Sequence, residues 1–222
     1  MGEDMDSLTA HNDYGDLPLD ESALDPDPLR QFATWLSEAE AAGVDEPNAM
    51  VVGTVDPDGA PNSRTVLLRG VDARGFAFYS NYDSQKGRGL ASTPAASLLF
   101  PWYLLHRQVI VQGRVSRLGA AESDAYFASR PRGSQLAAIV SQQSQPIASR
   151  AELEQRVADL SRLLSGPDGE ELPAERPANW GGYVVSPRRI EFWKGRTSRL
   201  HDRLVYTRDS PDTPWEVTRL QP

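Results

Sequence analysis

Three residues that could contact a ligand lie two apart in the stretch TSRLHDRLVY, residues 197–206. In an extended strand, side chains two apart share a face, so Arg199, His201 and Arg203 would point the same way. Like charges at that spacing repel unless something negative or electron-rich lies over them. The stretch is therefore either a solvated hairpin edge or a strand that faces a ligand. The ordinary pKa of histidine suits proton handling near neutral pH.

A second group of cationic and hydroxyl-bearing residues lies at strand ends and in loops. It comprises Arg64 and Arg69 on either side of TVLL, Lys86 and Arg88 in SQKGR, and Arg130 and Arg132 around Pro131, with Ser134 close by. Guanidinium, ammonium and hydroxyl groups are what a phosphate monoester needs. Taken one at a time, these residues are also typical of solvated surface charge.

Three features of the sequence leave alternatives open. Arg64 and Arg69 are five apart, so a regular strand would place them on opposite faces. Either a bulge intervenes or the two residues serve different parts of a site. Trp193 in IEFWKG is typical of a core or barrel-rim aromatic residue but could also face a ligand. Amides such as Gln108 and Gln143 would need hydrogen-bond partners if they are buried.

The elements that must position these residues follow from the hydrophobic pattern. The stretch DPDPLRQFATWLSEAEAAG predicts a helix, with Asp27 as its cap, Pro28 at its first position and Gly43 after its end. Three strand-like runs separated by turn residues follow, at 49–55, 63–71 and 75–81. Such runs predict a meander of antiparallel strands.

The rest of the chain mixes helices and strands. Further strands are expected at 96–103, 107–118, 181–187, 188–195, 203–208 and 215–220. Helical stretches are expected at 122–130, 133–140 and 149–165, the last with an apolar stripe of Leu153, Val157, Leu160 and Leu164. Because the helices are set between strands and do not alternate as βαβ units, we predict a mainly β fold with helical insertions, an antiparallel barrel.

The composition excludes several classes of function. Cysteine is absent, which excludes disulfides and thiolate catalysis, and the three histidines show no metal-ligand spacing, so no metal site is predicted. No uncharged apolar run approaches the roughly 18 residues of a membrane span. The N-terminus does not resemble a signal peptide, so we expect a cytoplasmic protein that does not contact membranes. The lack of a long basic run argues against nucleic-acid binding.

The net charge of −8 at pH 7 is concentrated at the N-terminus. Residues 1–28 contain nine acidic residues and no Lys or Arg, whereas the other 194 residues carry 23 basic and 22 acidic residues. Such a segment is typical of a solvated, disordered arm. We therefore predict a disordered acidic arm over residues 1–26 and a single folded domain over residues 27–222.

Many of these stretches together resemble one known family. In chain order they are DPLRQFATWL, PNAMVVGTVDPDGAPNSRTVLLRG, FYSNYDSQKG, SLLFPWYLLHRQVIVQGRV, YFASRPRGSQL, SQQS, WGGY, RIEFWKG, RLHDR and RLQP. They resemble the pyridoxamine 5'-phosphate oxidase family from about residue 27 to residue 222. The resemblance implies a split β-barrel homodimer that binds flavin mononucleotide (FMN) in clefts at the subunit interface.

The resemblance also implies a reaction. The family oxidises pyridoxine or pyridoxamine 5'-phosphate to pyridoxal 5'-phosphate, and O2 reoxidises the reduced flavin with release of hydrogen peroxide. One alternative is a related flavin oxidase that acts on another ring, such as a phenazine precursor, because SQKG also resembles that branch of the superfamily. Another is a non-catalytic binder of flavin or of vitamin B6 phosphates, and a deazaflavin-using reductase is more distant.

The resemblance assigns roles to individual residues. The flavin is expected to contact Arg64, Val66, Leu67, Arg69, Tyr79, Ser80, Gln85, Lys86, Gln108, Gln143, Ser144, Trp193 and Arg203, with its phosphate at Arg64, Lys86 and Ser144. The substrate is expected to contact Arg69, Tyr126, Arg130, Ser134, Arg199 and His201. Of these, Arg199 and His201 are the expected catalytic residues, because they would lie against the substrate ring.

Three positions depart from the family pattern. Arg69 stands where the family usually has lysine, and Gln85 stands where many members have arginine. The N-terminal arm lacks the arginine-rich segment that closes over substrate in several members, and only Tyr14 hints at it. The stretches YFASRPRGSQ and RLHDR retain the expected phosphate and ring contacts, which favours a vitamin B6 phosphate as substrate.

Overall fold

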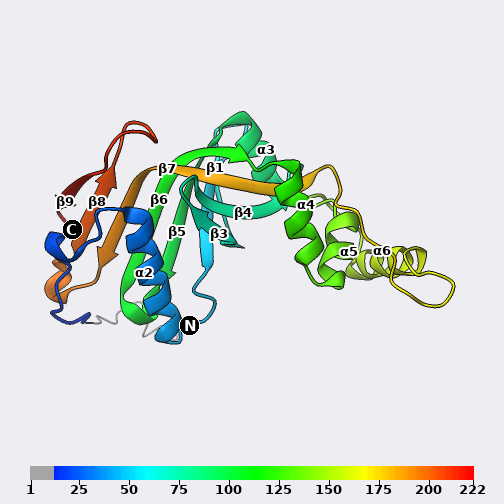
Figure 1. Ribbon diagram of the computed structural model, residues 1–222, viewed down its shortest axis with the longest axis horizontal. Coiled ribbons are helices and arrows are strands. Elements are labelled where there is room, and N and C mark those ends of the chain that lie inside the picture. Colours follow the sequence, from blue (N-terminus) through cyan, green and yellow to red (C-terminus); the bar gives the residue numbers. More distant parts are fainter. Residues whose placement is uncertain (1–12) are drawn as a thin grey trace, which may run out of the picture. The chain divides into compact units, whose positions relative to one another are not determined.

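The computed structural model describes residues 13–222 (Figure 1). Its contacts divide the chain into two compact units. The first unit comprises residues up to 47 together with 99–111 and 188–222, and the second comprises 48–98 and 112–187.

The strands of the described residues form one sheet. They are β1 (Ala49–Val55), β2 (Pro61–Leu67), β3 (Gly70–Asp72), β4 (Gly75–Asn81), β5 (Ala95–Trp102), β6 (Arg107–Arg117), β7 (Trp180–Lys194), β8 (Asp202–Thr207) and β9 (Glu216–Leu220). The order is β2-β1-β5-β6-β7-β4-β3, with β8 paired to β7 and β9 paired to β8. The pairs β1–β2, β3–β4, β4–β7, β7–β8 and β8–β9 are antiparallel.

Helices are inserted between these strands. The α-helices are α2 (Pro28–Ala41), α3 (Gln85–Ser92), α4 (Ala120–Ser129), α5 (Arg132–Val140) and α6 (Arg150–Leu163). Short 3-10 turns occur at η1 (Glu21–Ala23), η2 (Tyr103–Leu105) and η3 (Thr197–Arg199). A mainly antiparallel sheet with helical insertions is the predicted fold class, which is confirmed. Within residues 13–222, no helix is both long and apolar enough to cross a membrane.

Helix α2 packs on the first unit as its sequence pattern predicts (Figure 1). The Asp27 side chain caps the helix by accepting a hydrogen bond from the backbone N–H of Leu29 at 2.9 Å. On the buried face, the Phe32 ring centroid lies 4.8 Å from that of Phe100, and Trp35 meets Phe192 edge to face at 5.1 Å. This aromatic layer anchors the helix on the sheet residues of its own unit.

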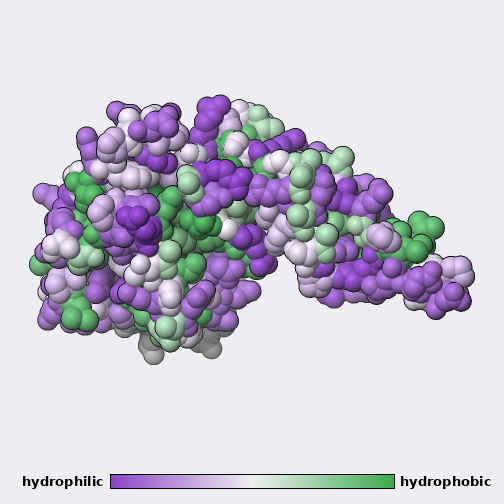
Figure 2. Space-filling model, viewed as in Figure 1, coloured by the Kyte–Doolittle hydropathy of each residue, from purple (hydrophilic) through white to green (hydrophobic). Residues whose placement is uncertain are grey.

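Helices α5 and α6 of the second unit lie side by side. The predicted stripe of Leu153, Val157, Leu160 and Leu164 is half-buried, while most other residues of α6 are exposed. Figure 2 shows a mainly hydrophilic surface over this helical segment, with a hydrophobic group near the end of α6. Leu163, at that end, is 75% exposed.

Two strand predictions are corrected by the structure. The expected strand 63–71 is divided into β2, which ends at Leu67, and β3, which begins at Gly70. The backbone N–H of Leu68 still pairs with the carbonyl of Asn48 beside β1 at 2.9 Å, but that of Arg69 changes partner and donates to Ala77 of β4 at 2.8 Å. The expected strands 181–187 and 188–195 form one strand, β7. Pro187 does not end β7, because the missing N–H falls where β7 changes its pairing partner from β4 to β8.

The prediction that Arg199, His201 and Arg203 share one strand face is wrong. Strand β8 begins at Asp202, so only Arg203 of the three lies on it. The preceding residues form the turn η3, in which Ser198 and Arg199 have positive φ angles of 55° and 60°. The left-handed backbone at these two residues reverses the chain direction, which a strand cannot do.

The described part of the acidic arm, residues 13–26, belongs to the first unit. Within residues 13–26, Leu19 is buried and Asp20 caps η1 by accepting from the backbone N–H of Ser22 at 2.9 Å. Residues 1–12 of the predicted arm lie outside the described residues. The boundary between an arm at 1–26 and a domain at 27–222 stays a prediction.

Helix α3 depends on a glycine at its third residue. A Cβ on Gly87 would lie 2.0 Å from the backbone oxygen of Tyr82, and backbone atoms cannot easily move aside. We expect Gly87→Ala to lower the free energy of unfolding by about 1–3 kcal/mol. The matched control is Gly133→Ala in α5, where a Cβ meets nothing within 4 Å and the change should stabilise by roughly 0.5 kcal/mol. Urea denaturation measures both, and equal effects would contradict the prediction.

Candidate functional site

A cavity of about 670 Å³ in the second unit brings together most of the predicted site residues. Its walls come from β2 and the residues after it, β4, α3, the α4–α5 junction and the start of β7. It is lined by Arg64, Thr65, Val66, Leu67, Arg69, Tyr79, Ser80, Lys86, Tyr126, Ser129, Arg130, Pro131, Ser134, Gln143 and Trp180. Arg64 and Arg69 both reach the cavity because the strand that carries Arg64 ends between them.

Lys86 is a buried cation in this cavity. Its Nζ donates hydrogen bonds to Gln143 Oε1 at 2.6 Å, to Ser80 Oγ at 3.0 Å and to Ser84 Oγ at 3.3 Å. Burial, together with the charge of Arg64, lowers the pKa of Lys86 to about 8. All three hydrogen-bond partners are neutral and leave the charge of Lys86 uncompensated. An anionic ligand in the cavity would compensate that charge.

Arg64 lies on β2 with its side chain turned along the neighbouring strand. Its Nη1 donates to the carbonyl of Val52 at 3.1 Å and to Thr54 Oγ1 at 2.8 Å. Partial burial of its charge lowers the pKa of the Arg64 guanidinium. These two bonds fix its orientation and leave its other donors available.

Arg130 carries an unpaired donor in the same cavity. Its Nη1 is buried and has no hydrogen-bond partner among the described residues. The guanidinium carbon lies 4.7 Å from the ring centroid of Trp180 and 5.8 Å from that of Phe127. A buried donor without a partner costs about 1–3 kcal/mol, which an anionic oxygen in the cavity would recover. The residues present therefore fit a phosphate group.

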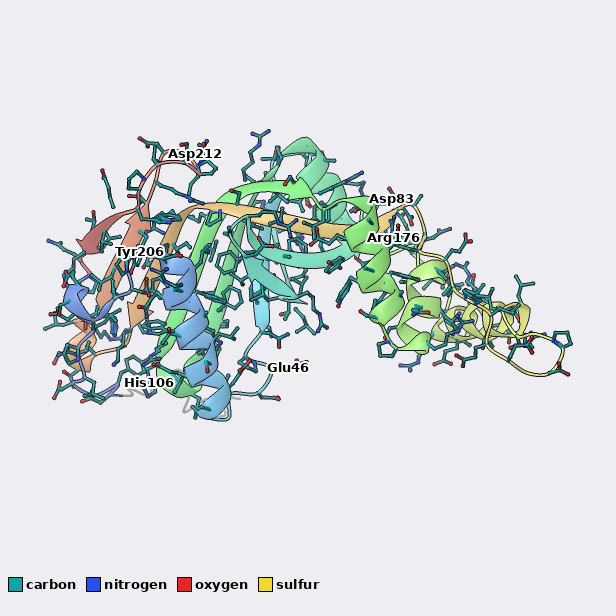
Figure 3. All side chains as sticks on the ribbon, in the orientation of Figure 1. Glu46, Asp83, His106, Arg176, Tyr206 and Asp212 are labelled. Carbon is teal, nitrogen blue, oxygen red and sulfur yellow. The ribbon has the colours of Figure 1, made fainter. Side chains whose placement is uncertain are left out.

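Stacked aromatic rings form part of the cavity wall. Tyr79 and Tyr126 lie 3.8 Å apart between ring centroids with an interplanar angle of 16°, and Trp180 is nearly parallel to Tyr126. Arg176, labelled in Figure 3, holds the Trp180 backbone, because its Nη1 donates to the Trp180 carbonyl at 2.6 Å while its Nε pairs with Asp124. Flat rings in this arrangement suit a planar ligand.

Four lining residues were not among the predicted site residues. They are Thr65, Ser129, Pro131 and Trp180. A sequence signal existed for Trp180, since WGGY is one of the family-like stretches, and for Ser129 and Pro131, which lie within YFASRPRGSQL. Thr65 sits between predicted residues on β2 and is exposed.

A second group of predicted residues lies in the first unit. The His201 ring lies 4.7 Å from Trp193 and 5.7 Å from Tyr14, and Tyr14 lies 4.6 Å from His106, all measured between centroids. Figure 3 marks His106 at the connection between β5 and β6. The backbone N–H of Arg196 donates to His201 Nδ1 at 3.1 Å, so the neutral ring carries its proton on Nε2. Burial, followed by the charge of Arg199, lowers the pKa of His201.

Arg203 is held by a buried carboxylate. Its Nε and Nη2 donate to the two oxygens of Glu191 at 2.7 and 3.1 Å, and Arg189 donates to Glu191 at 2.6 Å. Glu191 is only 2% exposed. The pKa of Glu191 is lowered because the hydrogen bonds and charges of the two arginines outweigh its burial. Gln108 is half-buried on β6 of the same unit.

Loss of this buried carboxylate should be costly. We expect Glu191→Ala to lower the free energy of unfolding by about 3 kcal/mol, because it leaves two partly buried guanidinium groups without their partner. The control is Glu154→Ala, which breaks the exposed pair with Arg150 and should cost about 0.5 kcal/mol. Urea denaturation measures the stability of both variants. Equal shifts of their unfolding midpoints would contradict the prediction that Glu191→Ala is the more destabilising change.

The remaining predicted residues lie outside the cavity lining. Gln85 donates to Asp56 Oδ2 at 2.6 Å, which ties the start of α3 to the β1–β2 turn. Ser144 follows Gln143 and has a positive φ of 71°. Trp193, Arg199, His201, Arg203 and Gln108 belong to the first unit and are not among the residues that line the cavity.

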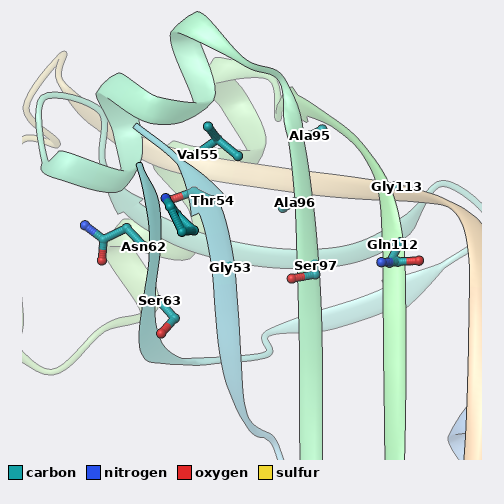
Figure 4. Close-up of a pocket in the computed structure, with 11 residues that line it drawn as sticks. Gly53, Thr54, Val55, Asn62, Ser63, Ala95, Ala96, Ser97, Gln112 and Gly113 are labelled. Atoms are coloured by element: carbon teal, nitrogen blue, oxygen red, sulfur yellow. The ribbon is translucent and has the colours of Figure 1, made fainter. Parts of the chain in front are cut away.

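A different cavity of about 660 Å³ in the second unit is unsuited to phosphate recognition. Small or uncharged residues of β1, β2, β5 and β6 line it, including Gly53, Ser97 and Gln112 (Figure 4). None of the predicted site residues contributes to it. Without a cationic side chain, it cannot compensate the charge of a phosphate.

Two family models cover most of the chain. Residues 36–163 match the model described as Pyridoxamine 5'-phosphate oxidase. Residues 180–222 match the Pyridoxine 5'-phosphate oxidase C-terminal dimerisation region. Together the two matches include large parts of both units and every predicted site residue.

Curated relatives align from end to end. The chain is 52% identical over 221 residues to the pyridoxine/pyridoxamine 5'-phosphate oxidase of Rubrobacter xylanophilus, covering 100% of this chain and 99% of that protein. It is 48% identical over 222 residues to the enzyme of the same name from Salinispora arenicola, covering 100% and 98%.

Two solved structures share the fold. PhzG from Burkholderia lata, in complex with tetrahydrophenazine-1-carboxylic acid, has a TM-score of 0.84 at 32% identity and covers 94% of this chain and 100% of its own. A pyridoxamine 5'-phosphate oxidase-related, FMN binding protein from Nostoc punctiforme has a TM-score of 0.69 at 18% identity, covering 88% and 98%. The second similarity concerns the fold alone.

Proposed function

Because the chain belongs to the pyridoxamine 5'-phosphate oxidase family, we propose that it oxidises pyridoxamine 5'-phosphate and pyridoxine 5'-phosphate to pyridoxal 5'-phosphate. The observation that carries the proposal is Arg130, whose buried Nη1 lacks a partner in a cavity that also contains Arg69 and Ser134. A phosphate monoester supplies the anionic oxygens that this donor needs. Tyr126 would pack beside the same group.

We propose FMN as the cofactor. The residues present fit its phosphate, because Lys86 and Arg64 place two partly desolvated cations in one cavity with hydroxyl and amide groups around them. Held there, FMN would supply the redox chemistry, with O2 as the final acceptor and hydrogen peroxide as its product, while water releases ammonia from the oxidised amine. Val66 and Leu67 supply apolar surface, and Tyr79 a ring, against which a planar cofactor can pack.

Arg199 and His201 would act at the substrate ring, and Trp193 and Arg203 at the flavin. His201 Nε2–H is a donor that can orient a polar group of the pyridine ring, because Nδ1 is already engaged by the Arg196 backbone. Anchoring the remote phosphate holds the reacting carbon in place and so lowers the entropic part of the barrier. We also propose a homodimer, supported by the match to the family's dimerisation region.

The test is anaerobic mixing of the FMN-loaded protein with each vitamer. We expect pyridoxamine 5'-phosphate and pyridoxine 5'-phosphate to bleach the yellow flavin absorbance, and unphosphorylated pyridoxine to do so far more slowly. Hydrogen peroxide should then appear when air is admitted. Absence of bleaching with both phosphorylated compounds would exclude the proposed activity.

A second candidate is oxidation of a phenazine precursor. It is favoured by the TM-score of 0.84 with PhzG and by the SQKG stretch at the start of α3. This activity predicts turnover of a tricyclic carboxylic acid without phosphate, unaffected by Arg130→Ala. A non-catalytic binder would instead retain FMN and give no peroxide with any substrate. The mass of the cofactor released from the purified protein separates FMN from a deazaflavin.

A further inference from the structure

The connection between β7 and β8 carries both residues proposed to act at the substrate ring, and its backbone is strained. Ser198 and Arg199 have φ angles of 55° and 60°, a region that side-chain-bearing residues seldom adopt. Such backbone persists only where the surrounding structure holds it. Within the connection itself, the backbone N–H of Leu200 donates to the Thr197 carbonyl at 3.1 Å, and that of Arg196 donates to His201 Nδ1 at 3.1 Å.

Three consecutive residues of the N-terminal arm, Tyr14, Gly15 and Asp16, contact this connection. The backbone N–H of Thr197 donates to the carbonyl of Gly15 at 3.2 Å, and the Thr197 hydroxyl donates to Asp16 Oδ1 at 2.6 Å. Tyr14 packs so closely that a Cβ on Gly195 would lie 2.7 Å from its ring. The arm therefore contacts the connection at Gly195 and Thr197, immediately before the two strained residues.

The arm also binds residues that follow His201 in the sequence. The backbone N–H of Leu19 donates to Asp202 Oδ2 at 2.9 Å, and Glu21 takes two bonds from Arg219 at 2.8 Å each. Figure 1 shows the arm, in blue, beside the red and orange strands β8 and β9. The acidic composition of the arm thus has a structural use, because its carboxylates bind groups of the C-terminal part of the chain.

We propose that Asp16 is a positioning residue, which holds the Thr197 hydroxyl and thereby fixes the backbone conformation that presents Arg199 and His201. The proposal rests on the proposed function, since it assigns these two residues to the substrate ring. In this role Asp16 acts through Thr197 and needs no contact with substrate or cofactor. It acts through a charge-assisted hydrogen bond, which is stronger and more directional than a bond between neutral groups.

The experiment compares Thr197→Val, Thr197→Ser and Asp16→Ala in the FMN-loaded full-length protein. Valine keeps the shape of threonine without its hydroxyl, whereas serine keeps the hydroxyl. We expect Thr197→Val and Asp16→Ala each to lower kcat for pyridoxamine 5'-phosphate by about tenfold, the effect of one charge-assisted hydrogen bond, with KM and the Kd for FMN little changed. Thr197→Ser should restore kcat to near the wild-type value.

The control is Asp20→Ala. Asp20 is an acidic residue of the same arm, but its side chain accepts hydrogen bonds from the backbone N–H and the hydroxyl of Ser22, within the arm itself. This variant should keep kcat within twofold of the wild type. The double variant with both Asp16→Ala and Thr197→Val should be no slower than either single variant, because the two changes remove the same bond.

Amide hydrogen exchange tests the positioning role without reference to turnover. In Thr197→Val, the amides of Arg196, Thr197 and Leu200 should exchange at least tenfold faster, while those of β8 and β9 stay at the wild-type rate. Wild-type kcat in Thr197→Val, or a lowered kcat with unchanged exchange, would overturn the proposal. If the wild-type protein oxidises no vitamin B6 phosphate, the proposed function fails, and the exchange measurement still decides whether Asp16 holds this connection.

Discussion

Replacement of Arg130 by methionine is expected to lower kcat/KM for pyridoxamine 5'-phosphate by about 100-fold, the loss of one or two hydrogen bonds to a charged group. Methionine retains the apolar stem that packs against Trp180 but has no donor for a phosphate. The buried Nη1 has no partner among the described residues, so in the wild type nothing competes with the ligand for it. Steady-state peroxide release gives the rate.

The neighbouring Arg132→Met is the matched control. Arg132 lies two residues away at the start of α5, donates to the Leu164 carbonyl at 3.4 Å and does not line the cavity. It should change kcat/KM less than threefold. A comparison with unphosphorylated pyridoxamine sharpens the test, because Arg130→Met should barely affect that compound. Equal losses with and without the substrate phosphate would show that Arg130 does not bind it.

Replacement of Lys86 by methionine is expected to raise the Kd for FMN by about 10- to 100-fold, since a buried charge-assisted bond to the cofactor phosphate is lost. Methionine fits the space without leaving a buried charge. Fluorescence quenching of FMN during titration measures the Kd. The control is Lys194→Met, which changes the other described lysine, half-buried in the first unit and absent from the cavity lining. An unchanged Kd in Lys86→Met would contradict the assignment.

The pH dependence of FMN binding provides a second signature of Lys86. In the free protein, burial and Arg64 lower the pKa of Lys86 to about 8, whereas a bound phosphate dianion favours the protonated amine and raises that pKa. Above pH 8 the complex therefore binds more protons than the free protein, so affinity falls as pH rises, by up to about tenfold per unit. Between the second pKa of a phosphate monoester, about 6, and pH 8, the Kd should be nearly constant.

This dependence should vanish in Lys86→Met. The remaining cation at the proposed phosphate site, Arg64, keeps its charge throughout this range, because even a lowered guanidinium pKa stays far above 8. Titration of FMN at pH 7, 8, 9 and 10 in both proteins gives the comparison. A persistent loss of affinity above pH 8 in the variant would assign the titrating group elsewhere.

The sequence by itself determined the local elements of this protein. The Asp27 cap, Pro28 and the spacing of Phe32 and Trp35 specify α2, and the observed helix begins at Pro28 as predicted. The alternating runs around residues 49–55 and 75–81 specify β1 and β4 with the predicted bounds. These features depend on propensities and contacts within one element, which a sequence displays directly.

Most of the residues that line the cavity were also predicted from the sequence, but by its resemblance to a family and not by residue spacing. Spacing alone left Arg64 and Arg69 on opposite faces of a strand, and it placed Arg199, His201 and Arg203 on one face. The break after Leu67 reverses the first of these conclusions and the turn η3 reverses the second. In both cases period-2 counting failed because the strand did not continue through the counted residues.

Only the tertiary structure decided how the charged groups are paired. The bonds of Arg203 to Glu191 and of Thr197 to Asp16 join residues 12 and 181 positions apart. Likewise, the orphan donor of Arg130 becomes visible only once the α4–α5 junction is folded against Trp180. Pairing at such separations depends on which segments pack together, and the left-handed backbone at Ser198 and Arg199 lies beside bonds that the arm makes from residues 15 and 16.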